Sequence, residues 1–225
     1  MFDRIAPRYD LLNRLLSGRR DVVWRRRLAA VLPTKPNLDI LDLATGTGDV
    51  ILTILNRRDN ISHVVGLDPA GEMLSLAQKK ICDAGQDNRT SLVRGDALFL
   101  PFPDGCFDAV TIAFGIRNVP DVPKALSEMQ RVLKPGGKAV ILEFSLPPNW
   151  LVRNIYLVYF RHILPRLGGI ISGDAGAYRY LDATVETFPF GEEFRLLMRT
   201  AGFNQTVAMP LTFGVATLYT GMRDN

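Results

Sequence analysis

Short runs of apolar and β-branched residues alternate with helix-length amphipathic segments along most of this 225-residue chain. A strand, a helix and a second strand in this order form a right-handed crossover that places both strands parallel in one sheet. We therefore predict an α/β fold with a mostly parallel sheet. The expected strands are residues 38–43, 63–68, 91–95, 107–114 and 138–144, and the expected helices are residues 49–57, 71–84 and 122–133.

The last two apolar runs predict a different connection. Residues 203–209 and 215–222 are separated only by a short turn around Thr212, Phe213 and Gly214. A turn of this length joins antiparallel strands. We expect seven strands in all, with an antiparallel strand near the C-terminal end of the sheet.

The chain length fits a single domain spanning residues 1–225. Within it, residues 1–35 and the long insertion at 147–189 are expected to form a helical cover over the carboxyl edge of the sheet, with a helix at 9–31. The two cysteines have no ligand-like spacing, so no metal site or disulfide framework is expected. Reduced cysteines and the absence of an apolar signal segment favour a cytoplasmic protein.

The turn after the first strand is the first candidate site, because ligands of open α/β sheets bind at the carboxyl ends of strands. Gly46 and Gly48 allow a ligand to approach the backbone closely. Ile51 stands where a dinucleotide fingerprint needs a third glycine. Asp42 and Asp49 add negative charge, which suits a ligand with an amine and a sulfonium. The alternative is a tight turn that binds nothing.

Acidic residues also follow the second and third strands. Asp68, about 20 positions after the glycine turn, can accept hydrogen bonds from the hydroxyls of a ribose, as found in NAD and S-adenosylmethionine. Asp96 can accept from an adenine amino group, while the backbone of Ala97 donates to a ring nitrogen. The alternatives are a helix N-cap at Asp68 and a turn aspartate at Asp96. Acidic groups at three successive strand ends favour one adenosyl pocket.

Residues 114–119 follow at the end of the fourth expected strand, beside the centre of the expected cleft. Arg117 and Asn118 are polar residues that follow an apolar strand, and we expect them to contact the acceptor substrate. The alternative for Arg117 is an ion pair with a surface carboxylate.

Several segments together resemble a known family, the ubiquinone/menaquinone biosynthesis C-methyltransferases. They cover nearly the whole chain and lie at residues 1–10, 42–49, 114–119, 131–137, 142–147, 177–181 and 201–203. The resemblance implies a Rossmann-like class I methyltransferase fold with S-adenosylmethionine as methyl donor. It also implies methyl transfer to a ring carbon of a polyprenylated quinol in menaquinone or ubiquinone biosynthesis, with demethylmenaquinol to menaquinol as the favoured conversion.

The resemblance implies that Thr47, Asp68, Asp96 and Ala97 bind the methyl donor. With the glycine turn and the end of the fourth strand, the positions expected to bind it are Gly46, Thr47, Gly48, Asp68, Asp96, Ala97 and Ala113. Ala113 occupies a position where the family often has serine, so a hydroxyl contact is lost there.

For catalysis, a quinol hydroxyl must lose its proton so that charge reaches the attacking ring carbon. Arg117 is the main catalytic candidate, because its cation can stabilise the developing phenolate while a water or a carboxylate takes the proton. Tyr178 is a second candidate, for orienting the quinol. His63 lies at the wrong end of its strand for a base, whereas His162 lies in the insertion and stays open.

The arginines at positions 19, 20, 25, 26 and 27 suggest three interpretations: a solvated helix face, contact with an anionic membrane, or a phosphate footprint for nucleic acid. No nucleic-acid methyltransferase motif supports the last of these, so we expect no nucleic-acid partner. Apolar residues of 150–164 could line a groove for the prenyl tail or pack as ordinary core. The rival functions are methyl transfer to oxygen or nitrogen of another small molecule, a nucleic-acid methyltransferase, and a binding protein without turnover.

Overall fold

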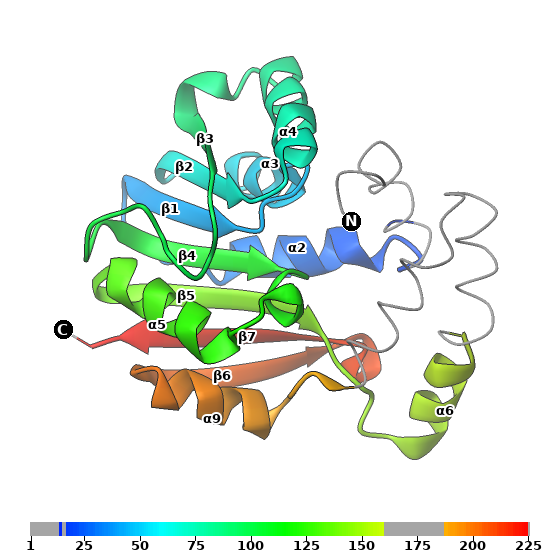
Figure 1. Cartoon of the computed structure of the whole chain (residues 1–225). Coiled ribbons are helices and arrows are strands. Elements are labelled where there is room, and N and C mark those ends of the chain that lie inside the picture. The colour runs from blue at the N-terminus through cyan, green and yellow to red at the C-terminus, as the bar shows by residue number, and fades with distance from the viewer. Residues whose placement is uncertain (1–13, 15–16, 160–186, 225) are drawn as a thin grey trace.

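The computed structural model describes residues 14, 17–159 and 187–224, and the strands of these residues form one seven-stranded sheet (Figure 1). The strands lie in the order β3-β2-β1-β4-β5-β7-β6. Strand β7 is antiparallel to both of its neighbours, while the other ladders are parallel, as predicted. The strands are β1 (Leu38–Leu43), β2 (Ile61–Asp68), β3 (Thr90–Arg94), β4 (Phe107–Ala113), β5 (Leu133–Phe144), β6 (Phe203–Leu211) and β7 (Ala216–Arg223).

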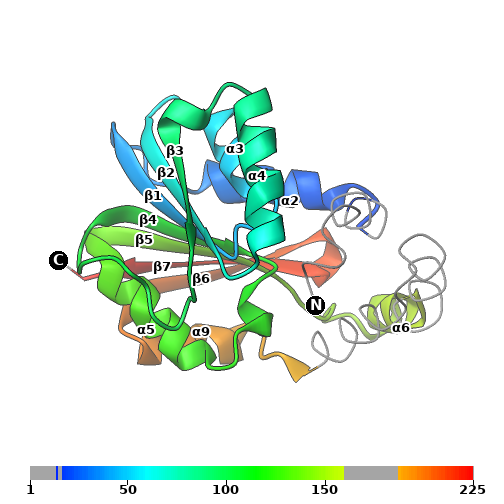
Figure 2. The same cartoon turned by 45° about the horizontal axis from the view of Figure 1, so that its top comes forward.

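Helices cover both faces of this sheet, as the two views show (Figure 1, Figure 2). Helices α2, α3 and α4 lie on one face, and α5 and α9 lie on the other, whereas α6 lies beyond the carboxyl ends of the parallel strands. The α-helices are α2 (Arg20–Ala30), α3 (Asp49–Leu55), α4 (Gly71–Asp83), α5 (Val122–Val132), α6 (Trp150–Val158) and α9 (Glu192–Thr200). Short 3₁₀ helices are η1 (Asp87–Arg89), η2 (Ile116–Asn118) and η4 (Thr212–Gly214).

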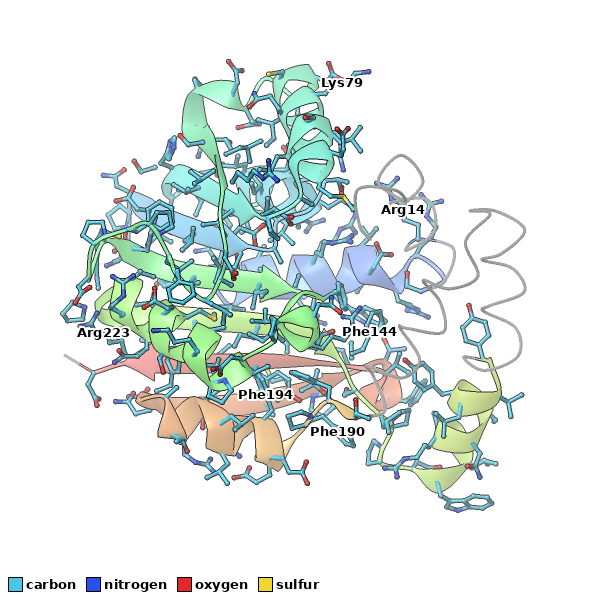
Figure 3. The ribbon with its side chains drawn as sticks, in the orientation of Figure 1. Arg14, Lys79, Phe144, Phe190, Phe194 and Arg223 are labelled. Carbon is cyan, nitrogen blue, oxygen red and sulfur yellow. The ribbon has the colours of Figure 1, made fainter. Side chains whose placement is uncertain are left out.

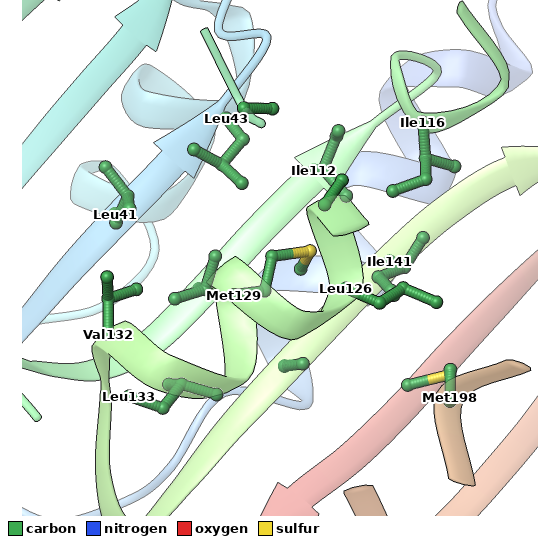
Figure 4. Packing of buried hydrophobic residues seen from close by; sticks show 14 of the residues in the cluster. Leu41, Leu43, Ile112, Ile116, Leu126, Met129, Val132, Leu133, Ile141 and Met198 are labelled. Atoms are coloured by element: carbon green, nitrogen blue, oxygen red, sulfur yellow. The ribbon is translucent and has the colours of Figure 1, made fainter. Parts of the chain in front are cut away.

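Each face of the sheet has its own hydrophobic core, as expected for parallel strands buried on both sides. On the α5 face, Leu126 and Met129 lie against Ile112 and Ile141 of the sheet, and all four are fully buried (Figure 4). Trp24, Leu28, Ile51, Ile54, Ala77 and Ile81 from α2, α3 and α4 form the second core with the other face. The apolar residues whose spacing predicted the helices are therefore the residues that pack against the sheet.

Strand β5 begins five residues earlier than predicted. Residues 134–137 lie between the predicted helix at 122–133 and the predicted strand at 138–144, but they continue the strand back to Leu133. The ladder with β4 passes from Phe107↔Leu133 to Ala109↔Lys138 through an irregularity. The irregularity takes up extra residues in β5, and Gly136, with a φ of 70°, lies within it. The Pro-Gly-Gly sequence is therefore part of the strand and lies at this irregularity.

The prediction of one continuous helix over residues 9–31 is wrong at its centre. Gly18 and Arg19 have φ values of 56° and 63°, which a right-handed helix cannot include, and α2 begins only at Arg20. Residues 1–13, 15–16, 160–186 and 225 lie outside the described part. The predicted cover over the carboxyl edge therefore stays a prediction.

Within the described part, no helix combines the length and apolar character needed to cross a membrane.

Candidate functional site

A pocket opens at the carboxyl ends of β1, β2 and β4, next to the loop that follows β3. It contains five of the seven positions predicted to bind the methyl donor: Gly46, Asp68, Asp96, Ala97 and Ala113. The rest of its lining is Ala44, Leu67, Pro69, Met73, Phe114, Gly115, Asn118, Val119 and Pro120. The strand-end argument therefore predicted the place of the pocket, because parallel strands bring their carboxyl ends to one edge.

Thr47 and Gly48 are not part of this lining. The Thr47 side chain is buried and its hydroxyl accepts a hydrogen bond from the ammonium of Lys80, at 3.2 Å. Gly48 is the N-cap of α3 and has a φ of 80°, and its backbone N–H donates to the carbonyl of Thr45. These two residues therefore shape the turn behind the pocket wall.

Asp68 is held in one orientation by backbone groups. Its two carboxylate oxygens accept hydrogen bonds from Gly46 N at 2.9 Å and from Ala70 N at 2.8 Å. The first bond joins the glycine turn to the end of β2, and the second lies at the start of α4. Asp68 is thus a pocket residue that also bonds the backbone just before α4, but the N-cap of α4 is Ala70 and not Asp68. Asp96 accepts from Leu98 N at 2.9 Å, which is the geometry of a turn aspartate facing the same pocket.

Backbone of unusual conformation forms the wall where β1 and β4 end. Ala44 has a φ of 47° and Phe114 a φ of 58°, both in the left-handed region that residues other than glycine rarely adopt. Gly115 comes so close to Ala44 that a Cβ on Gly115 would lie 2.5 Å from the Cβ of Ala44. Glycine at position 115 therefore permits the two turns to meet.

We expect Gly115→Ala to lower the free energy of unfolding by about 1–3 kcal/mol, because the added methyl must push apart two backbone turns. Urea denaturation measures the change. Gly71→Ala is the matched control. A Cβ there approaches only Arg94 Nη1, at 3.9 Å, and alanine favours the helix that Gly71 begins. If Gly115→Ala were as stable as the control, the close contact would not constrain this wall.

Asp42 lies fully buried beneath the glycine turn. It accepts hydrogen bonds of 2.6 Å from the hydroxyls of Thr45 and Thr111, and Thr111 is its register partner on β4. Burial raises the pKa of Asp42 to about 7, although the two hydroxyls oppose this change. The side chain is therefore a carboxyl that can gain or lose its proton near neutral pH.

The arginine segment is not wholly a solvated face. Arg25 is buried and its guanidinium lies 2.7 Å from Asp21 and 3.3 Å from Asp49, whereas arginines 19, 20, 26 and 27 are exposed. Lys80 also bonds Asp49. Burial alone would raise the pKa of Asp49, but the cations of Arg25 and Lys80 hold it below its usual value. Arg25 therefore joins α2 to the start of α3.

The predicted catalytic Arg117 lies in η2, and its guanidinium forms a buried ion pair. Its Nη1 is 2.5 Å from Glu143 Oε1 and 2.7 Å from the carbonyl oxygen of Phe114. The ring of Phe144, labelled in Figure 3, lies 5.3 Å from its Cζ. The next residue, Asn118, lines the pocket, and its buried Oδ1 has no hydrogen-bond partner among the described residues. An acceptor without a partner at a pocket wall suits a ligand that donates a hydrogen bond.

The sequence interpretation did not identify Glu143, Lys80 or Met73 as parts of the site or its support. Glu143 follows an apolar run, so its signals were an acidic residue near the end of the fifth strand and its place in segment 142–147 of the family resemblance. Tyr178 and His162 lie outside the described residues. His63 lies in the first half of β2, away from the carboxyl end of that strand, and its ring bonds the hydroxyl of Ser91. In the described part, no cluster of His, Cys, Asp or Glu side chains could hold a metal ion.

Comparisons with known proteins show the family of the chain. The ubiE/COQ5 methyltransferase family matches residues 1–223. A protein named demethylmenaquinone methyltransferase from Thermus thermophilus is 52% identical over 223 residues, which are 99% of this chain and all of that protein. A protein named ubiquinone/menaquinone biosynthesis C-methyltransferase UbiE from Geobacter sulfurreducens is 48% identical over 221 residues, covering 98% of this chain and 86% of the relative.

Among solved structures, phosphoethanolamine N-methyltransferase 2 of Haemonchus contortus in complex with S-adenosyl-L-methionine has a TM-score of 0.64 at 15% identity, covering 86% of this chain and 50% of its own. A carbon methyltransferase, CurJ, has a TM-score of 0.63 at 18% identity, covering 87% and 51%. At these identities the likeness shows the fold alone, which is the expected Rossmann-like class I methyltransferase fold. The family match over nearly the whole chain, together with two relatives that are each matched over most or all of their length, shows that this chain belongs to the ubiE/COQ5 methyltransferase family.

Proposed function

We propose that this protein transfers a methyl group from S-adenosylmethionine to a ring carbon of a polyprenylated quinol in menaquinone or ubiquinone biosynthesis, with demethylmenaquinol as the favoured acceptor. The observation that carries the proposal is the meeting of Asp68, Asp96 and Asn118 in one pocket at the carboxyl edge. The names of the relatives support the quinol as acceptor.

The pocket residues fit the methyl donor. The carboxylate of Asp68, held by two backbone N–H groups, can accept from the ribose hydroxyls. Asp96 and the backbone of Ala97 suit the adenine, and Ala113 adds no hydroxyl of its own. Asn118 Oδ1, buried and without a partner among the described residues, can accept from a donor group such as an amine.

S-adenosylmethionine, when bound, supplies an electrophilic methyl group. Arg117 lies one residue from the pocket wall and carries a cation that can stabilise a developing phenolate on the quinol. Its burial strengthens this effect, because its side chain is only 7% exposed and water screens it little. A water or carboxylate takes the hydroxyl proton, and Tyr178 orients the quinol.

We expect Asp68→Asn to raise the Kd for S-adenosylmethionine by about 10–100-fold, because hydrogen bonds to a charged acceptor contribute about 1.5–3 kcal/mol. One carboxylate oxygen becomes an amide group that cannot accept from Gly46, Ala70 or a ribose hydroxyl. Isothermal titration calorimetry measures the Kd. Asp83→Asn, an exposed site on α4, is the control and should leave it unchanged. Equal affinity in both variants would contradict the assignment of Asp68.

Incubation with labelled S-adenosylmethionine and a panel of demethylated quinols tests the proposed function. We expect label on a ring carbon of a quinol, with demethylmenaquinol the best acceptor. Label on oxygen or nitrogen of another small molecule, or on nucleic acid, would replace this function with a rival one. Absence of transfer to every acceptor, despite donor binding, would favour a binding protein.

We propose further that the protein contacts an anionic membrane surface, where a prenylated acceptor would reside. Exposed arginines at positions 19, 20, 26 and 27 supply positive charge. Helix α6 turns apolar side chains outward, with Trp150 71% and Ile155 64% exposed. Basic side chains near an anionic surface contribute about 1 kcal/mol each, and aromatic side chains favour the membrane interface.

A vesicle flotation assay tests this contact. We expect binding to vesicles rich in phosphatidylglycerol at low salt, little binding to phosphatidylcholine alone, and weaker binding at 0.5 M NaCl. The Arg26→Glu/Arg27→Glu double variant should bind at least about tenfold more weakly. Salt-independent binding, or none at all, would contradict the proposal.

A further inference from the structure

Glu143 is a fully buried carboxylate for which the mechanism above has no use. It lies near the end of β5 and its side chain is 0% exposed. Removing a charged pair from water is costly, and well-packed apolar residues often replace such a pair without loss of stability. An ion pair whose arginine is the chain neighbour of the pocket residue Asn118 therefore calls for a functional explanation.

The contacts of Glu143 all lead to Arg117 or to the adjoining backbone. Oε1 accepts from Arg117 Nη1 at 2.5 Å and from Phe144 N at 2.8 Å. Oε2 accepts from the backbone N–H of Arg117 at 3.3 Å. Both oxygens of this carboxylate already accept hydrogen bonds from the protein, and its charge is paired with the guanidinium of Arg117. Glu143 is therefore badly placed to be the proton acceptor itself.

The same contacts hold the Arg117 side chain in one orientation. Nη1 is shared between Glu143 and the carbonyl of Phe114, and the ring of Phe144 lies beside the guanidinium. On another edge, Nε is buried and has no hydrogen-bond partner among the described residues. A buried N–H donor without a partner is rare in folded proteins, and it suits an oxygen supplied by a ligand.

We propose that Glu143 is a positioning residue, which holds Arg117 so that its Nε–H edge meets the oxygen of the acceptor. This inference rests on the proposed methyl transfer to a quinol. Glu143 acts only through Arg117, since its side chain bonds Arg117 and the backbone N–H of Phe144, and neither residue lines the pocket. The left-handed Phe114 belongs to the same arrangement, because its carbonyl is the second acceptor for Nη1.

A double-mutant cycle on kcat tests the proposal. We expect Glu143→Gln to lower kcat about 10–100-fold, because a displacement of about 1 Å in a catalytic group has effects of this size. The Kd for S-adenosylmethionine should stay within about twofold of the wild-type value. In the Arg117→Gln background, Glu143→Gln should lower kcat no further, since the group that it positions is gone.

Glu128→Gln is the matched control. Glu128 is also a largely buried carboxylate, 8% exposed, and it bonds Arg131 in α5, away from the pocket. This variant should lose stability while keeping kcat. If Glu143→Gln behaves like the control, or lowers kcat equally in both backgrounds, the proposal is overturned.

If Glu143→Gln does not fold, Glu143→Asp replaces it in the same test. The shorter side chain keeps the negative charge but moves it away from the guanidinium of Arg117. If neither variant folds, Glu143 is structural and the proposal is overturned. A wild-type protein without quinol methylation would defeat the proposed function. An active wild type with a fully active, folded Glu143→Gln variant would defeat only this inference.

Discussion

Arg117→Gln should lower kcat for quinol methylation by about 10²–10³-fold, because loss of one preorganised donor to a developing oxyanion has an effect of this size. The buried position of the guanidinium makes the effect large, since little water can replace it. Labelled methyl transfer under single-turnover conditions measures the chemical step. The Kd for S-adenosylmethionine should change little, because Arg117 is not part of the pocket lining.

This variant also leaves the Glu143 carboxylate buried without its cation. Breaking a buried pair costs about 3–5 kcal/mol of stability, so the folded fraction must be measured by circular dichroism at the assay temperature. Arg195→Gln is the control, because Arg195 pairs with the exposed Glu192 on α9, and its loss should leave kcat unchanged. A folded Arg117→Gln protein with wild-type kcat would contradict the catalytic assignment.

The fold was largely predictable because its signals are local. Alternating apolar runs specify strands and helices, short connections limit their topology, and parallel strands must bring their carboxyl ends together. The place of the pocket follows from that last step. Even the antiparallel β7 was predictable, since the three residues of η4 leave no room for a crossover.

Pairing across long sequence separations was not predictable in the same way. The alternative interpretation of Arg117 was an ion pair with a carboxylate on the surface. The observed partner, Glu143, is fully buried and lies 26 residues away in the sequence. Arg25 likewise belongs to a basic run whose periodicity could not show that it points inward to Asp49. Such contacts depend on how helices pack on the sheet, which periodicity alone does not determine.

Wild-type stability should fall as the pH rises from about 4 to about 7, through the ionisation of Asp42. Burial is the main reason that its pKa is raised from 3.8 to about 7 in the folded protein. A group with a raised pKa in the folded state contributes stability below its unfolded pKa and loses it as the pH rises through the folded pKa. The loss is about 1.4 kcal/mol per pH unit between these values, so about 4 kcal/mol in all.

Asp42→Asn isolates this contribution from that of other carboxyl groups. The amide cannot ionise, and of the hydroxyls of Thr45 and Thr111 one can still donate to its oxygen while the other turns to accept from its NH2 group. Urea denaturation at pH 5 and pH 8 should show the variant gaining roughly 2–3 kcal/mol on the wild type between the two values. The exposed Asp87→Asn should show no such gain. A pH-independent difference for Asp42→Asn would mean that Asp42 stays ionised throughout this range. Added S-adenosylmethionine should reduce the gain, because a sulfonium cation near the turn favours the ionised carboxylate.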